Sequence, residues 1–161
     1  MPTYTTEQIL ALLLDNPAAM AALTAGLTPD QLKQRTDVDQ WSLLDLLAHV
    51  RATADGWGAA IGRVLGHAGL IARTPVVEPH LAKRTPATGE YAPAFRDYAR
   101  QRTRLLTVLT SMTAADWQRT APGSRTKAER AKTVELLAQH MVRHEQTHLK
   151  QVRRIVRAMN R

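Results

Sequence analysis

The segment from His140 to Gln151 constrains the fold more than any other, because it places metal-ligand side chains where a helix normally presents its core. At about 100° per residue, four apolar side chains share one side of a helix here: Leu137, Met141, Val152 and Ile155. His144 and His148 fall near the middle of that apolar stripe, and His140 falls at its edge. Imidazoles in such a stripe need a hydrogen-bond partner or a ligand, since bare burial is costly.

Length and the absence of cysteine limit what the chain can be. With 161 residues it can bury a core without disulfides, and we expect one domain over residues 1–161. Cysteine is absent, which excludes thiolate zinc fingers, CxxC redox chemistry and cysteine nucleophiles. Any metal must therefore be held by His, Asp or Glu side chains.

The residue usage predicts an all-α protein, because Ala, Leu, Arg, Gln and Met are frequent and no segment alternates convincingly as a strand. Four long helices are expected, over about residues 5–23, 42–65 and 90–112 and from Ser124 or Thr133 onward. Residues 66–90 are rich in Gly and Pro and form a long connection, long enough to be a lid or a wall of a site. The pattern predicts a four-helix bundle with one long crossover connection.

Residue types within these helices give three local predictions. Asn16-Pro17 should interrupt the first helix, with a renewed helix from Ala18 to Leu23, because proline lacks a backbone N–H. Ser42 and Asp45 are a capping pair at the start of the second helix. In the third helix we expect four arginines to point outward: Arg96, Arg100, Arg102 and Arg104.

The net charge of +8 is distributed unevenly. Residues 1–60 carry three Lys or Arg and seven Asp or Glu, while residues 61–161 carry nineteen and seven. Such an asymmetry fits nucleic-acid binding or an anionic substrate. We favour an arginine-rich solvent face, because the arginines are spread over several helices and only one Phe and three Tyr are available for base stacking.

The sequence also bears on location and assembly. The N-terminus lacks a basic region followed by an apolar run, and no segment has 18 uninterrupted apolar residues. We therefore expect a cytoplasmic protein with no membrane partner. Exposed faces of helical bundles often dimerise, and we expect a homodimer.

His144-Glu-Gln-Thr-His148 has the spacing of the H-E-x-x-H motif of zinc metalloproteases. Two imidazoles one helical turn apart can bind one metal ion, and Glu145 is the candidate catalytic base, with a solvent-exposed helix position as the alternative. Those enzymes take a third ligand downstream, whereas no His, Asp or Glu follows His148 here. The third ligand must come from upstream, where three histidines precede the last helix: His49, His67 and His80.

Two motifs in a fixed order resemble a known family. Trp41-Ser-Leu-Leu-Asp-Leu-Leu-Ala-His49 is followed 95 residues later by His144-x-x-x-His148-x-x-Gln151. This combination resembles the DinB-like superfamily (DinB/YfiT), as do the helix count and the total length. The resemblance implies that His49, His144 and His148 are the ligands of a divalent metal. Without the resemblance, we would interpret His49 as a histidine at the edge of the core. We interpret His67 and His80 as solvated loop residues.

The resemblance also implies a function. Members include S-transferases and isomerases that use low-molecular-weight thiols, and proposed hydrolases. We therefore expect a metal-dependent enzyme acting on a small molecule, with zinc favoured over nickel, iron or copper and a low-molecular-weight thiol as a second cofactor. Asp45 and Gln151 are candidates for contacts behind the ligands, with a helix cap and a solvated amide as the respective alternatives that we favour. Three arginines could hold an anionic group of the cofactor: Arg51, Arg96 and Arg143.

Two other classes of function stay open. One is a non-catalytic metal-binding helical bundle that sequesters metal or binds a partner; an open coordination position beside a cavity would distinguish an enzyme from it. The other, which we favour least, is nucleic-acid binding through the basic last helix.

Overall fold

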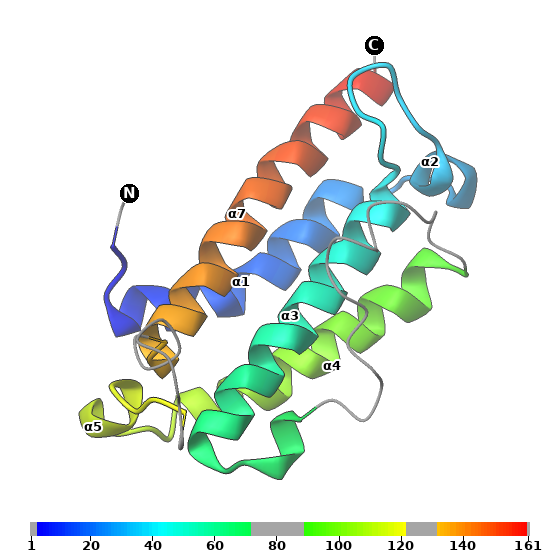
Figure 1. Cartoon of the computed structure of the whole chain (residues 1–161). Coiled ribbons are helices and arrows are strands. Elements are labelled where there is room, and N and C mark those ends of the chain that lie inside the picture. Colours follow the sequence, from blue (N-terminus) through cyan, green and yellow to red (C-terminus); the bar gives the residue numbers. More distant parts are fainter. Residues whose placement is uncertain (1–2, 72–88, 122–131, 161) are drawn as a thin grey trace.

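The protein is a bundle of four long helices: α1 (Thr6–Thr24), α3 (Leu43–Leu65), α4 (Tyr91–Leu109) and α7 (Val134–Met159) (Figure 1). This computed structural model describes residues 3–71, 89–121 and 132–160. Three short elements lie between the long ones within these ranges: α2 (Pro29–Lys33), the 3-10 helix η1 (Ala68–Leu70) and α5 (Ala114–Trp117). The described residues contain no strand, only an isolated bridge between Thr36 and Asp39. The predicted all-α four-helix bundle is confirmed.

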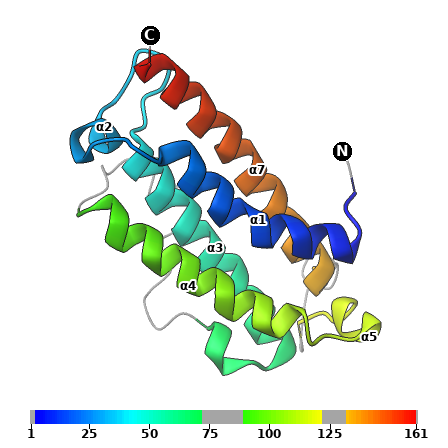
Figure 2. The same cartoon turned by 180° about the vertical axis from the view of Figure 1, so that it is seen from behind.

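The four long helices run up, down, down and up. α1 and α7 run in one direction, and α3 and α4 run in the other (Figures 1 and 2). α7 packs against α1 and α3, and α4 packs against the same two helices on the other side. Because α3 and α4 are parallel, the chain between them has to return along the bundle, a span of about 35 Å for a helix of this length. This topology confirms the predicted long crossover.

Side-chain caps set where the helices begin. The Ser42 hydroxyl accepts from the Asp45 backbone N–H, while the Asp45 carboxylate accepts from the Ser42 backbone N–H, as predicted. Thr5 and Gln8 form the same reciprocal cap on α1. Thr133 caps α7, which begins at Val134; the alternative start at Ser124 lies outside the described residues, as do residues 72–88 of the long connection.

The predicted interruption of the first helix was wrong, because α1 runs through Pro17 without a break. An interior proline removes one backbone hydrogen bond and costs about 3 kcal/mol. Core contacts on both sides of the proline offset this cost. Leu13 and Met20 are at most 2% exposed, and the buried Asn16 amide bonds to side chains of α7. Tertiary packing therefore overrides the local break.

In the described part of the chain, the core follows the inner faces of the long helices in three clusters. Leu43 and Leu46 of α3 meet Leu149 and Val152 of α7 in one of them, so the seam between these antiparallel helices is apolar at that end. Farther along α3, Ile61 packs with Met141 of α7 in another cluster. None of the helices in the described ranges is both long and apolar enough to cross a membrane.

Replacing Pro17 with alanine should stabilise the protein. The helix regains a backbone hydrogen bond, partly offset by the greater entropy of the unfolded chain, so the free energy of unfolding should rise by about 2 kcal/mol. Urea denaturation measures this change. Pro29→Ala is the matched control, because Pro29 lies in the first turn of α2, where proline is tolerated. An equal effect of both substitutions would contradict the cost assigned to the missing backbone hydrogen bond at Pro17.

Candidate metal centre

Three imidazoles converge in the seam between α3 and α7. The Nε2 atom of His144 lies 2.9 Å from Nε2 of His49 and 3.1 Å from Nε2 of His148. His49 is 4% exposed, and the other two rings are partly buried. Among the residues that the structure describes, these are the three His, Asp or Glu side chains whose ligand atoms come close enough to share one ion. The three predicted ligand residues are therefore brought together.

The spacing of the three nitrogens fits a metal site. A tetrahedral ion with bonds of about 2.0–2.1 Å to nitrogen holds its ligand atoms about 3.3 Å apart. The two short distances at His144 are close to that value. All three donors are imidazoles, which suit zinc, nickel, iron or copper. An ion held by these three side chains alone would keep at least one coordination position for another molecule.

The other histidines stand apart from this group. His140 lies on α7 one turn before His144 and is exposed to solvent. His67 follows α3 and is also exposed. His80 lies outside the described residues. The position of His140 at the edge of the apolar stripe agrees with its exposure.

Two tryptophan rings pack against the imidazoles. The Trp41 ring is stacked on His148, with ring centroids 6.1 Å apart and an angle of 7° between the planes. The same indole meets His49 edge-on, with centroids 4.9 Å apart. Trp57 meets His144 edge-on from the next turns of α3, at 5.1 Å. These rigid rings limit how the imidazoles can rotate.

A chain of hydrogen bonds supports His148 from behind. Its Nδ1 atom lies 2.8 Å from Oε1 of Gln151, and Nε2 of Gln151 donates to the Asp39 carboxylate at 2.7 Å. Burial raises the pKa of Asp39, but bonds from Gln151, the Trp41 backbone and Arg154 lower it by more, so its pKa lies below the ordinary value. Gln151 therefore contacts His148, a candidate ligand, so the alternative of a solvated amide was wrong. Asp39 was not predicted, because nothing in the local sequence distinguishes this linker residue.

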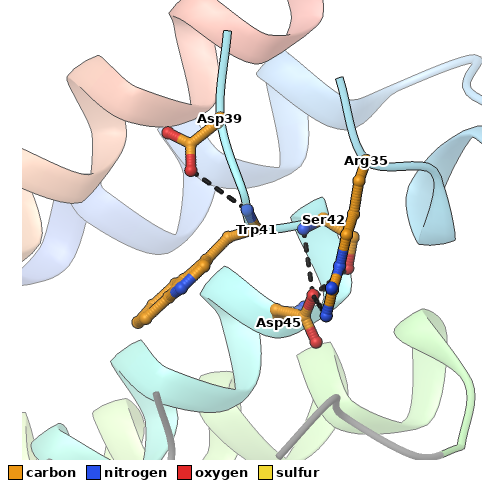
Figure 3. A network of polar contacts seen from close by, with 5 residues as sticks. All are labelled: Arg35, Asp39, Trp41, Ser42 and Asp45. Atoms are coloured by element: carbon orange, nitrogen blue, oxygen red, sulfur yellow. Dashed lines mark hydrogen bonds and ion pairs between the residues drawn. The ribbon is translucent and has the colours of Figure 1, made fainter. Parts of the chain in front are cut away.

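Asp45, the other expected contact, serves the start of α3. Its carboxylate accepts hydrogen bonds from the backbone N–H and hydroxyl of Ser42, and Arg35 lies 3.5 Å away (Figure 3). The helix-cap role of Asp45 is thus observed.

Glu145 lies inside the bundle, so the alternative of an exposed helix position was wrong. It is 2% exposed, its carboxylate pairs with the Arg102 guanidinium, and the Asn16 amide donates to it at 2.7 Å. It is not one of the side chains that converge on the possible ion. Burial raises the pKa of the neighbouring Tyr98 hydroxyl, and the Glu145 charge raises it further. The carboxylate therefore faces α1 and α4, whereas His144 and His148 face α3.

The predicted outward orientation of Arg102 was wrong, because the residue is 2% exposed. Its guanidinium carbon lies 5.5 Å from the centroid of the Tyr98 ring. Tyr98, Arg102, Leu105 and Leu109 follow the spacing of one buried helix face. Periodicity could have placed Arg102 inward; the residue type alone misled the prediction. Arg96, Arg100 and Arg104 are exposed as expected.

The arginines considered for an anionic cofactor are spread over the molecule. Arg51 pairs with Asp97 at 3.4 Å and lines a cavity of about 660 Å³ formed by α3, η1 and α4. Arg143 donates to Gln139 at 2.7 Å, and Arg96 is exposed. The side chains that form the cavity include Arg51, but the three histidines do not line it.

The fold and the converging imidazoles define a helical-bundle protein with a candidate site for one metal ion. The chain belongs to the DinB superfamily, which it matches over residues 12–152. The family predicted from the two motifs is thereby confirmed.

A solved structure with a similar fold is YfiT from Bacillus subtilis, with a TM-score of 0.71 and 16% sequence identity. The match covers 99% of this chain and 92% of that chain. YfiT is described as "a probable metal-dependent hydrolase with an unusual four-helix bundle topology". At this level of identity the comparison shows a shared fold. No curated protein matches the chain.

Breaking the buried ion pair should destabilise the protein more than removing both partners. Arg102→Met leaves the Glu145 carboxylate buried without its cation, which should lower the free energy of unfolding by about 3–5 kcal/mol. The double variant Arg102→Met/Glu145→Met should recover much of this loss. Urea denaturation of both variants measures the difference.

Arg51→Ala is the control for this comparison, because Arg51 forms an exposed pair with Asp97. Its effect should not exceed about 1 kcal/mol. If Arg102→Met proved as mild as the control, the buried pair would not have the structural role assigned to it.

Proposed function

We propose that this protein is a metal-dependent enzyme that acts on a small molecule, with His49, His144 and His148 as the ligands of a divalent ion. The observation that carries the proposal is the convergence of three Nε2 atoms from two antiparallel helices. A purely hydrogen-bonded cluster would not require all three rings to present the same atom to one point. Zinc is the ion we favour, since it accepts an all-imidazole set in tetrahedral geometry.

The residues around the site fit a catalytic role. A divalent ion held by three imidazoles acts as a Lewis acid and lowers the pKa of a water molecule or a thiol. Trp41 and Trp57 pack against the rings, and Gln151 contacts Nδ1 of His148. Three ligands rather than four leave room for a reacting molecule, which a closed structural site lacks.

Two reaction types agree with this site. Hydrolysis of a small molecule is supported by the fold shared with YfiT and by the words used to describe that protein. Transfer or isomerisation with a low-molecular-weight thiol is the second candidate, because a three-imidazole site also activates a thiol. We place the enzyme in the cytoplasm as a homodimer, in line with the expectations from the sequence.

Glu145 is the residue predicted from the sequence to accept a proton in the reaction. A catalytic role for Glu145 stays a prediction, and its bonds to Arg102 and Asn16 support a structural role instead. Because both carboxylate oxygens have partners inside the bundle, we propose that this residue fixes α7 rather than taking a proton.

Metal analysis tests the ligand set. Purified wild-type protein should hold about one equivalent of divalent ion after loading, and His49→Ala should lose most of it, because one of three ligands is gone. Inductively coupled plasma mass spectrometry measures the content. His140→Ala is the matched control, since it removes an exposed imidazole from the same helix as two ligands. Unchanged metal content in the His49 variant would remove this residue from the site.

Turnover assays separate the two reactions. Zinc-loaded protein should convert small esters or amides without a thiol if it is a hydrolase. It should need a thiol if it is a transferase or an isomerase, consuming the thiol in a transfer and regenerating it in an isomerisation. His148→Ala should reduce either rate to background while His140→Ala retains it. A zinc-loaded protein that holds its metal tightly and turns over neither class of substrate would favour the non-catalytic metal-binding bundle.

A further inference from the structure

Asp39 contacts both groups that hold His148, although it lies in the linker between α2 and α3. Its Oδ2 atom accepts from Nε2 of Gln151 at 2.7 Å, and its Oδ1 atom accepts from the backbone N–H of Trp41 at 3.1 Å. Figure 3 shows the carboxylate facing the backbone nitrogen of Trp41. The Asp39 side chain is 7% exposed, and Arg154 donates to the same Oδ2 at 2.5 Å.

The turn that carries Asp39 is itself fixed. The backbone N–H of Asp39 donates to the Thr36 carbonyl at 3.1 Å, and the two residues form a β-bridge. The carboxylate is therefore a fixed acceptor beside α7. Its ionised state agrees with the downward shift of its pKa.

A carboxylate determines which way the Gln151 amide faces. An ionised carboxylate accepts hydrogen bonds and cannot donate them, whereas an amide has a donor end and an acceptor end. The NH₂ group of Gln151 must therefore face Asp39, which leaves Oε1 facing Nδ1 of His148. The reverse orientation would place an oxygen against the carboxylate.

The amide in turn determines the tautomer of His148. Oε1 of Gln151 can only accept, so Nδ1 of His148 must carry the proton that forms the 2.8 Å contact. A neutral imidazole protonated at Nδ1 has its lone pair at Nε2. That is the atom that faces His144 and the shared position between the three rings.

We infer that Asp39 is a positioning residue for the three-histidine site: through Gln151 it sets the tautomer of His148, and through Trp41 it sets the ring packed on it. This inference rests on the proposed metal site. The linker between α2 and α3 thus has a role in the site, although Asp39 and Gln151 are far apart in the sequence.

Asp39→Asn tests the inference, because the variant keeps the shape but replaces one acceptor with a donor. The single remaining oxygen can serve either the Trp41 backbone or Gln151. If it serves Trp41, the new NH₂ group favours a flipped Gln151 whose own NH₂ faces Nδ1 of His148. If it serves Gln151 and Arg154, the new NH₂ group opposes the Trp41 backbone N–H and displaces the indole that packs on His148. The Kd for Zn²⁺, measured by competition with a chromophoric chelator, should rise by about tenfold or more, as for other residues behind metal ligands.

Two further variants separate orientation from general damage. Asp37→Asn makes the same chemical change at an exposed position of the same linker and should leave the Kd unchanged. Asp39→Asn/Gln151→Glu restores an acceptor opposite His148 and a donor opposite residue 151, so it should recover most of the lost affinity. A double variant no better than Asp39→Asn would overturn the assignment of the amide orientation.

The tautomer of His148 can also be measured in the metal-free protein. Long-range ¹H–¹⁵N NMR of the metal-free protein should show His148 protonated at Nδ1 in wild type and in the double variant, and a loss of that state in Asp39→Asn. Wild-type protein that binds no divalent ion would refute the proposed function, while the NMR comparison would still test Asp39. Wild-type metal binding with the same Kd and tautomer in Asp39→Asn would refute this inference alone.

Discussion

The structure depends on placing three imidazoles in the apolar seam between two antiparallel helices. Rings buried there are favourable only if their polar atoms have partners. His49 from α3 and His144 and His148 from α7 satisfy part of this need by pointing their Nε2 atoms at one another. An ion shared by the three nitrogens would offset the cost of burying the imidazoles. The same ion would supply the chemistry proposed for the site.

Polar contacts on two sides of α7 fix how that helix is rotated. Toward α1 and α4, Glu145 pairs with Arg102 and accepts from Asn16 inside the bundle. Toward the linker before α3, Gln151 donates to Asp39. Apolar contacts alone tolerate sliding and rotation, whereas directional bonds and a buried ion pair do not, which is the best-attested structural use of such pairs. The imidazoles of α7 are held between these two sets of contacts.

The topology explains why the two ligand-bearing helices are neighbours. α3 and α7 are the second and last long helices, far apart in the chain, yet they pack side by side (Figures 1 and 2). The parallel arrangement of α3 and α4 requires the long connection after η1 and leaves the other side of α3 for α7. A simple up-and-down order would use short loops and place successive helices antiparallel to each other.

The sequence by itself determined the long helices and the Ser42–Asp45 cap, because periodicity and capping pairs are local properties of the chain. The family, and through it the three residues that could hold a metal, came from the resemblance carried by two motifs. Only the tertiary structure decided that α1 continues through Pro17, that Arg102 and Glu145 are buried together, and that Asp39 supports His148 through Gln151. Each of these depends on side chains far apart in sequence. The physical reason is that burial and pairing of side chains across the bundle outweigh the local conformational or solvent preference of a single residue type.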